Sequence, residues 1–457
     1  MITGRWLMIA ASIWSLGAST LINAQPLALD DYVREGLQSN LALKQQNFSY
    51  QKSEEALRQA RGLFFPALTL NARYSEIDGN VIDLGTLINP VYSTLNQLLQ
   101  AEAFPTDLDL RLPLQRETKA TLAQSIFHPA ILYNYRLRSN LRDAETAQLG
   151  AFERQLVADI KTAYLNYAKT VRVVELYRKT LPLLEENLRV NESLHANQKV
   201  TADAVYRARA ELSDIKQKLS EAEQQNDAAG QYFNFLLNRQ LDTPITLVTD
   251  SLLAVEITTS LDKAQAEARE RREEFQQLRA GIKASEAAVK VNTANFLPTL
   301  SLGVDFGFQG NKYDFGADQD YLVVSLVAQW NIFNGFQDVA KRQQASLEVS
   351  RLRTQLAELE NQIALQVRVA FNDAAVAKAA IATANDRLAS AQKSFELVAK
   401  KYEQGSAAQV EYIDARTAFT NAGINQILTA YDYYIKYAEL ERAAGLYPSE
   451  DLQSARK

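Results

Sequence analysis

The chain has 457 residues, a formal net charge of −5 and no cysteine. Without cysteine, disulfides, thiolate chemistry and a lipid-anchoring cysteine are excluded. Charges of both signs are interspersed, so the composition gives no reason to expect nucleic-acid binding. Because only 10 prolines and 17 glycines are set in long helical patterns, the chain predicts few, long elements.

The first 24 residues have the pattern of an export signal. Arg5 precedes an apolar stretch at residues 6–16, and Ala24 ends a possible cleavage site before Gln25. We therefore expect an exported mature chain that starts at Gln25 and is not a lipoprotein. An uncleaved anchor is the less favoured alternative, because the apolar core is shorter than the ~20 residues of a spanning helix. No later apolar run reaches that length, so we expect any membrane entry to use strands.

One structural unit occurs twice. Residues 64–70 (Phe-Phe-Pro-Ala-Leu-Thr-Leu) recur as residues 296–302 (Phe-Leu-Pro-Thr-Leu-Ser-Leu), 232 positions later. In each copy a charge-rich helical stretch stops at a proline and an alternating, strand-like stretch begins. Farther along, Ala208 matches Ala415, only 207 positions later, so the first copy has 25 extra residues between these anchors.

The extra residues are assigned to positions 79–107. This segment contains the turn signals Asn89-Pro90 and Phe104-Pro105, and we predict an enlarged loop without helix or strand. Its counterpart at 310–320 is predicted to be a shorter hairpin loop.

The predicted elements follow the same order in both copies. Short helical patterns at 27–37 and 41–62 come first, and Pro182 is expected to kink the first long helix. The first repeat is predicted at 25–238, with strands at about 67–78 and 108–127 and long helices at 130–196 and 203–238. A linker follows at 239–260. The second repeat is predicted at 261–444, with a helix at 261–295, strands at about 299–309 and 321–333 and long helices at 336–404 and 409–444, and a tail follows at 445–457.

Each long helix is nearly matched in length by two shorter ones, so we expect long, roughly antiparallel helices packed as coiled coils. The strands have two unlike faces. The fourth is apolar at alternate positions and more polar between them, where Ser325 and Gln329 lie; Asp305 has the same place in the third. Strands of ~10 residues with this pattern fit a lipid-facing barrel with a wet lumen, although alternation alone also fits a half-buried sheet in a water-soluble protein.

Aromatic residues gather where strands meet helices, as in an interfacial belt. The candidate membrane-interface aromatics are Phe64, Phe65, Phe127, Phe296, Trp330, Phe333 and Phe336. Four strands cannot close a barrel, and unpaired strand edges cost several kcal/mol per group in lipid. We therefore predict a homotrimer with twelve strands, whose helices continue the wall on the periplasmic side.

The doubled helix-Phe-x-Pro-x-Leu-x-Leu-strand unit and the tyrosine-bearing turn at 402–406, followed by residues 412–416, resemble the TolC-type outer-membrane efflux proteins. The resemblance covers essentially the whole mature chain. It implies a mainly α fold with a trimeric twelve-stranded membrane β-barrel and a long periplasmic α-helical barrel. It also implies an outer-membrane exit duct of a Gram-negative bacterium for small molecules or secreted proteins, working with a periplasmic adaptor and an inner-membrane transporter in tripartite efflux or type I secretion.

The same resemblance implies a closed helical tip held by a tyrosine, an arginine and aspartates. Tyr402 and Asp414 match these positions, and Glu411 replaces an aspartate, whereas Ala407 and Ala204 stand where charged residues are expected. Asp203 is the nearest carboxylate to Ala204, and other closing pairs could use Arg207, Arg209, Arg416 or Lys401. These could equally be ordinary solvated helix charges, since exposed pairs contribute ~0–1 kcal/mol. The candidate adaptor-contact turns are Asn197, Gln198 and Lys199, and Gln404, Gly405 and Ser406.

Motifs for catalysis and cofactor binding are not apparent. The only two histidines, His128 and His195, are far apart and have no cysteine partners, so a transition-metal site is not expected. No phosphate loop or nucleophile elbow is present, and we expect neither an enzyme nor a cofactor. The alternative function from another class is a soluble periplasmic coiled-coil scaffold or adaptor.

Overall fold

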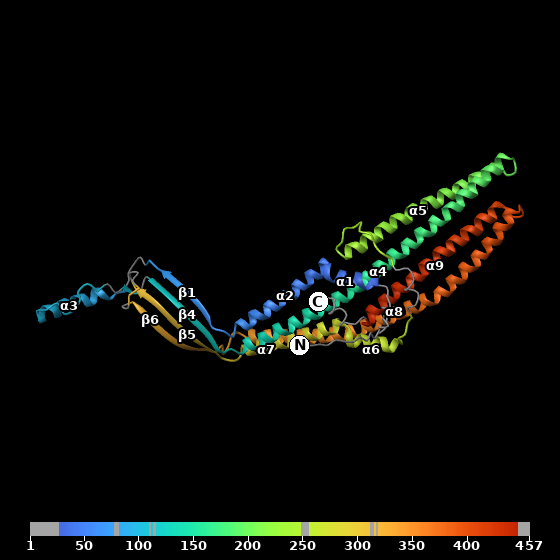
Figure 1. Cartoon of the computed structure of the whole chain (residues 1–457). Helices are drawn as coiled ribbons and strands as arrows, with labels where there is room; N and C mark the ends of the chain where they lie inside the picture. Colours follow the sequence, from blue (N-terminus) through green and yellow to red (C-terminus); the bar gives the residue numbers. More distant parts are fainter. Residues whose placement is uncertain are drawn as a thin grey trace, which may run out of the picture.

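The computed structural model describes residues 27–76, 82–108, 111–112, 116–247, 256–310, 315–316 and 319–446. The molecule is strongly elongated: long helices form one end, a four-stranded sheet continues them, and the helix α3 (Leu84–Leu99) projects beyond the sheet (Figure 1). The predicted signal peptide at 1–24 and the predicted tail from residue 447 onward lie outside the described residues.

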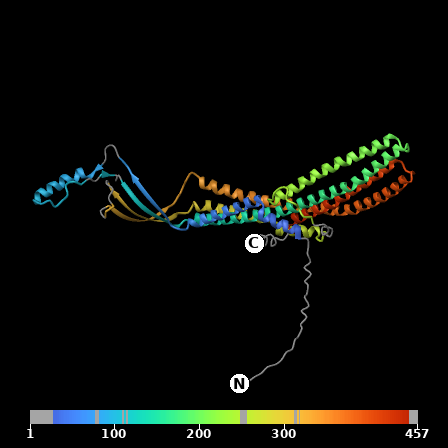
Figure 2. The same cartoon turned by 45° about the horizontal axis from the view of Figure 1, so that its top comes forward.

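The sheet takes two strands from each copy of the repeat. All neighbours are antiparallel, in the order β1 (Ala67–Tyr74), β4 (Arg116–Phe127), β5 (Thr299–Gly310) and β6 (Asp320–Gln329). Pro66 and Pro298 stand directly before β1 and β5, because the residue before a proline is pushed out of the helical region. The turned view shows a curved sheet, with the ends of the long helices on the opposite side of the molecule (Figure 2).

The register brings the alternating residues of the four strands onto common faces. Leu68 pairs with Leu122, Leu122 with Val304, and Val304 with Val324, so one apolar row crosses the whole sheet. The next row, through Thr121 and Asp305, lies on the other face. The two-faced pattern of single strands thus becomes a two-faced sheet.

The predicted loop at 79–107 is wrong in its main feature, because it contains helix α3 above a two-residue ladder of β2 (Ile82–Asp83) and β3 (Arg111–Leu112). Leucine, isoleucine and valine recur in α3 at helical spacing, and Asp83 caps its first turn by accepting from the Gly85 N–H at 2.9 Å. Pro90 lies inside the helix. It removes one backbone hydrogen bond, and the remaining helical residues offset that loss.

The first strand is shorter than predicted, since β1 ends at Tyr74. The predicted second strand at 108–127 contains both β3 and β4, and residues 109–110 and 113–115 lie outside the described residues. The fourth ends at Gln329, where the chain leaves the ladder and passes through positive φ at Gly335 and Phe336. The helices are α1 (Leu27–Ser39), α2 (Leu41–Gly62), α4 (Pro129–Ala196), α5 (Ala202–Leu236), α6 (Leu261–Arg271), α7 (Glu273–Ala294), α8 (Gln337–Glu403) and α9 (Gln409–Ala444). Helix α4 runs without interruption through Pro182. Among the residues described, no helix has the length and apolar character needed to cross a bilayer.

The single helix predicted at 261–295 is divided at Arg272, whose backbone is extended at φ −71° and ψ 125°. Its buried guanidinium donates from Nη1 to Gln366 at 2.9 Å and pairs with Glu274. The break has a counterpart 232 positions earlier at Asn40, which separates α1 from α2 and caps α2. The prediction missed the break because Arg272 is a good helix former, and its conformation is held by contacts across the fold.

Each long helix packs against several shorter ones. Helix α4 packs on α2, α5, α7 and α9, and α8 packs on α7 and α9 (Figure 1). The core holds aromatic and branched residues together with many alanines that allow close helix approach, and its fully buried members include Ile160, Phe233, Val367 and Leu440. The long helices thereby carry the chain from the sheet to two helix turns at the far end.

Candidate functional site at the helical tip

The two turns at the tip have the same backbone conformation. In the α4–α5 turn, Lys199 N–H donates to Leu194 O at 2.9 Å and Gln198 has φ 60°. In the α8–α9 turn, Ser406 N–H donates to Lys401 O at 2.9 Å and Gly405 has φ 72°. These are Schellman motifs, which satisfy the last helical carbonyls. The six predicted turn residues Asn197, Gln198, Lys199, Gln404, Gly405 and Ser406 are all exposed.

Tyr402 joins the two helix hairpins within one chain. Its hydroxyl donates to Oδ1 of Asn191 at 3.2 Å, and the Asn191 side chain is wholly buried. Nδ2 of Asn191 in turn donates to Asn187 O at 2.8 Å. The Tyr402 ring stacks on Tyr412 with 4.9 Å between ring centroids. The predicted tyrosine is therefore part of a link from α8 to α4, and its partner is an asparagine that no sequence pattern indicates.

A second link uses the backbone at Ala204, where a charged residue was expected. Nε2 of Gln409, the first residue of α9, donates to Ala204 O at 2.7 Å. A carbonyl near the start of α5 thus accepts from the other hairpin, where an aspartate was expected.

The third link is an ion pair between Arg416 of α9 and Glu211 of α5, with the side chains 3% and 11% exposed. Thr417 also donates to the Glu211 carboxylate, at 3.4 Å. Nε and Nη1 of Arg416 and Oε2 of Glu211 have no hydrogen-bond partner among the described residues. Burial lowers the pKa of Arg416 to about 10, so the guanidinium remains charged at neutral pH.

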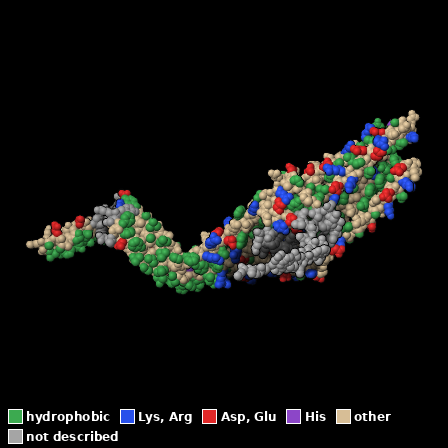
Figure 3. Space-filling model, viewed as in Figure 1, with side chains coloured by type: hydrophobic (Ala, Val, Ile, Leu, Met, Phe, Trp, Pro, Cys, Tyr) green, Lys and Arg blue, Asp and Glu red, His purple; other side chains and the backbone are tan. Residues whose placement is uncertain are grey.

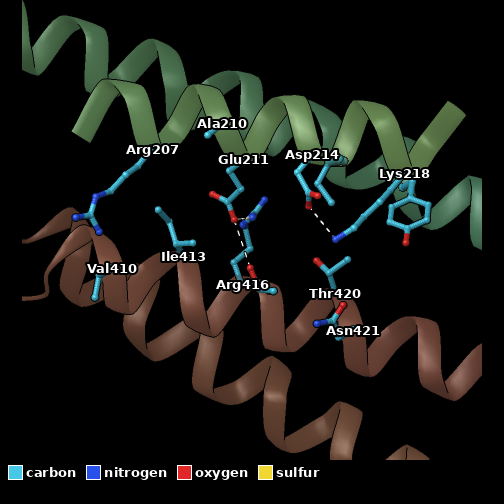
Figure 4. Close-up of a pocket in the computed structure, with 13 residues that line it drawn as sticks. Arg207, Ala210, Glu211, Asp214, Lys218, Val410, Ile413, Arg416, Thr420 and Asn421 are labelled. Carbon is cyan, nitrogen blue, oxygen red and sulfur yellow. Dashed lines mark hydrogen bonds and ion pairs between the residues drawn. The ribbon is translucent and has the colours of Figure 1, made fainter. Parts of the chain in front are cut away.

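This pair lies in a cavity of about 420 Å³ between α5 and α9. Figure 4 shows the side chains of Glu211 and Arg416 pointing toward each other across the gap, with Asp214 and Lys218 paired farther along. The pair joins the two hairpins, and removing one of its partners would leave the other charge buried and uncompensated, at a cost of about 3–5 kcal/mol. Because some of its donors and one acceptor have no hydrogen-bond partner among the described residues, this ion pair joins α5 and α9 less strongly than a fully hydrogen-bonded pair would.

The remaining predicted gate residues form no link between the hairpins of one chain. Glu411 and Asp414 are exposed, and no hydrogen bond or ion pair joins their side chains to the described residues. Asp203 accepts from the Thr201 hydroxyl and lies 3.4 Å from Arg207, one turn along its own helix. The Thr201 hydrogen bond is the main cause that lowers the pKa of Asp203.

Glu211, Asn191 and Gln409 were missed by the sequence prediction. One signal was available for Glu211: α5 and α9 both begin at the tip, after Thr201 and Ala408, so residues at similar distances from these caps reach similar depths. Glu211 and Arg416 satisfy that condition. The distance from the caps does not, however, indicate which faces of α5 and α9 meet.

At the other end of the long helices, the structure places the seven candidate interface aromatics at one level, where every strand joins a helix. Trp330 is 60% exposed and its Nε1–H donates to Phe296 O at 3.0 Å. Phe333 and Phe336 meet edge to face with 5.3 Å between ring centroids. Phe64, Phe65 and Phe127 are also exposed.

The sheet beyond them is open on both faces. Leu70 is 77% exposed and Leu322 is 65% exposed, and the surface over the strands is largely hydrophobic (Figure 3). The opposite face carries a polar network in which Thr121 donates to Asp305 at 2.5 Å and Tyr321 donates to Glu117 at 2.8 Å. None of the described helices packs across either face.

The chain resembles known proteins in part of its sequence and in its fold. Residues 265–446 match the model of a family described as outer membrane efflux protein. No curated protein matches the chain. A membrane protein from Pseudomonas aeruginosa is 18% identical, with a TM-score of 0.77, over 97% of this chain and 99% of that one. The Vibrio cholerae outer membrane protein VceC is 15% identical, with a TM-score of 0.73, over 91% of this chain and 96% of that one.

The Campylobacter jejuni outer membrane channel CmeC is 15% identical, with a TM-score of 0.74, over 94% of this chain and 89% of that one. At these identities the likeness is one of fold. It extends over nearly the full length of all three proteins.

Proposed function

We propose that this chain, whose residues 265–446 match the model of the outer membrane efflux protein family and which has the fold of outer-membrane channels, forms an outer-membrane exit duct. The duct conducts small molecules or proteins passively from the periplasm to the exterior. It serves a tripartite efflux or type I secretion system, and its conduction needs no catalytic residue.

The observation that carries this proposal is the uncovered two-faced sheet. Leu326 is 66% exposed in the single chain, although it shares a face with the apolar row from Leu68 to Val324 that crosses all four strands. A water-soluble scaffold would bury such a face, because large exposed apolar patches mark interfaces or lipid contacts. In a trimer, twelve strands would close around a polar lumen lined by Asp305, Ser325 and Gln329, with the apolar face toward lipid.

The exposed aromatics at the strand–helix junction support the placement of this level at the periplasmic membrane interface. The long helices then lie in the periplasm, and the two exposed tip turns point toward the inner membrane. These turns are suited to contact a periplasmic adaptor that docks with an inner-membrane transporter.

Access at the tip is controlled by whether the two hairpins of each chain stay together. The Tyr402–Asn191, Gln409–Ala204 and Arg416–Glu211 links favour the closed arrangement. Glu411 and Asp414 are free to interact with the neighbouring subunits. Partner docking would open the duct by offsetting these links.

Two adjacent residues of β6 provide a matched test. Leu326→Lys places a charge on the apolar face, where it costs about 2–4 kcal/mol in lipid, whereas Ser325→Lys places it on the polar face. We expect Leu326→Lys to abolish heat-modifiable trimers in outer-membrane fractions and Ser325→Lys to retain them. Purified Ser325→Lys trimers should still form channels in planar bilayers. A soluble wild-type monomer, or equal tolerance of both substitutions, would refute the proposal.

A further inference from the structure

Helix α3 lies beyond the end of the sheet that is farthest from the long helices, in both views (Figures 1 and 2). One of its faces packs on the chain segment that returns to the sheet. Asn89 exchanges two hydrogen bonds with the backbone of Leu108, at 3.0 and 2.9 Å, and Asn96 exchanges two with Phe104, at 2.6 and 2.8 Å. Tyr92 and Phe104 lie with 5.2 Å between ring centroids. The helix is therefore held in place by one face.

The other face of α3 is apolar and uncovered. Leu87, Val91 and Leu98 are 68%, 55% and 76% exposed, and Thr94 is exposed between them. The spacing 87, 91, 94, 98 is that of heptad a and d positions, which form a helix–helix seam. The 16 residues of α3 include no charged side chain.

We propose that α3 associates through Leu87, Val91, Thr94 and Leu98 with α3 of the other two chains, forming a three-helix cap over the outer mouth of the duct. The proposal rests on the trimer of the proposed function. In that trimer the loops after the three β1 strands surround one axis at one height. Tethering three identical seams in this way gives a high effective concentration for their association.

The dimensions allow the three helices to meet. Twelve strands about 4.8 Å apart, tilted by about 40°, enclose a radius on the order of 12 Å. Three helices packed 8–10 Å apart lie about 5–6 Å from their shared axis. An inward lean of about 6 Å from the barrel wall, over the 24 Å that the 16 residues of α3 span, would bring the three seams together.

Lipid is the less favoured occupant of this face. Helices that lie on a membrane surface carry lysine or arginine on the polar face and often tryptophan beside it, and α3 has none of these. A packed three-helix core would narrow the exit at a point remote from the tip, so the duct would have two constrictions.

The absence of native cysteine allows a clean crosslinking test in the full-length protein. Leu98→Cys lies on the seam, and Thr86→Cys is an exposed control off the seam of the same helix. After mild oxidation of outer-membrane fractions, we expect Leu98→Cys to yield a covalent dimer within the trimer and Thr86→Cys to yield none. Val91→Cys should behave as Leu98→Cys does.

Trimer formation is measured separately on the same samples, by comparing the electrophoretic mobility of heated and unheated protein under reducing conditions. Trimers without a seam-specific crosslink would overturn the cap and leave the exit duct intact. Loss of the wild-type trimer would overturn both. A fluorophore on Leu98→Cys that is quenched by quencher-labelled lipid would identify lipid as the occupant and would also overturn the cap.

Discussion

Arg154 of α4 donates from Nε and Nη2 to the two carboxylate oxygens of Glu273, at 2.8 and 2.7 Å, and the two side chains are 5% and 10% exposed. Glu273 is the first residue of α7, so its carboxylate also lies near the positive end of that helix. The pair joins the first copy of the repeat to the second.

Arg154→Ala should destabilise the fold by about 3–5 kcal/mol, because it leaves the Glu273 carboxylate buried without its main partner. Denaturant unfolding of the detergent-solubilised protein, followed by circular dichroism, measures this loss. The double substitution Arg154→Met with Glu273→Leu should cost much less. Equal losses for the single and double variants would contradict the argument.

Glu211→Gln should raise channel conductance in planar bilayers, because Arg416 loses its charged partner and the link between α5 and α9 weakens. Arg178→Ala is the matched control, since its pair with Glu223 is 2.6 Å long but exposed at 64% and 42%. Exposed pairs contribute about 0–1 kcal/mol, so the control should conduct as the wild type does. Unchanged conductance for Glu211→Gln would remove this pair from the gate.

Tyr402→Phe should favour opening to a smaller extent. The change deletes the hydroxyl that donates to Asn191 and keeps the ring that stacks on Tyr412. This hydrogen bond contributes about 1 kcal/mol, and its loss corresponds to an approximately fivefold shift of the open–closed equilibrium toward the open state. Single-channel open probability measures it, and a double-mutant cycle with Asn191→Ala should show strong non-additivity; additive effects would contradict a direct link.

The two tip turns should respond in opposite ways to exchange of their left-handed residues. Gln198 has φ 60° and Gly405 has φ 72°, and nothing lies within 4 Å of a Cβ added at Gly405. Gln198→Gly should therefore relieve local strain, while Gly405→Gln should introduce about 1 kcal/mol of it. Hydrogen exchange of the amides in each turn reports the change, and the same sign in both turns would refute this account.

Acid should loosen the first turn through Asp203. The hydrogen bond from Thr201 lowers the pKa of Asp203 below its ordinary value of 3.8, so its stabilisation is present above that value and is lost as pH falls through the lowered one. Amide exchange at residues 200–204, corrected for intrinsic rates, should accelerate more as the pH falls below 3.8 than it does in Asp203→Asn. Identical pH profiles would exclude Asp203 as the cause.

The predicted strands and long helices depended on local signals, and these predictions were close to the structure. Pro66 and Pro298 end helices and precede strands at the same repeat offset, 232 positions apart. Gln198 and Gly405, 207 positions apart, occupy the same place in their turns. The sequence prediction misses helix α3 because Asn89-Pro90 is a turn signal, although a proline can be accommodated in a helix whose other residues favour it.

The order of elements, the two-faced strands and the duplication were determined by the sequence alone, because proline position and apolar periodicity act within a few residues. The links at the tip were decided only by tertiary structure. Glu211 meets Arg416, and Tyr402 meets Asn191, across more than 200 residues of chain. Such pairs depend on which faces of four long helices pack together, and periodicity identifies an apolar face without identifying the helix that covers it.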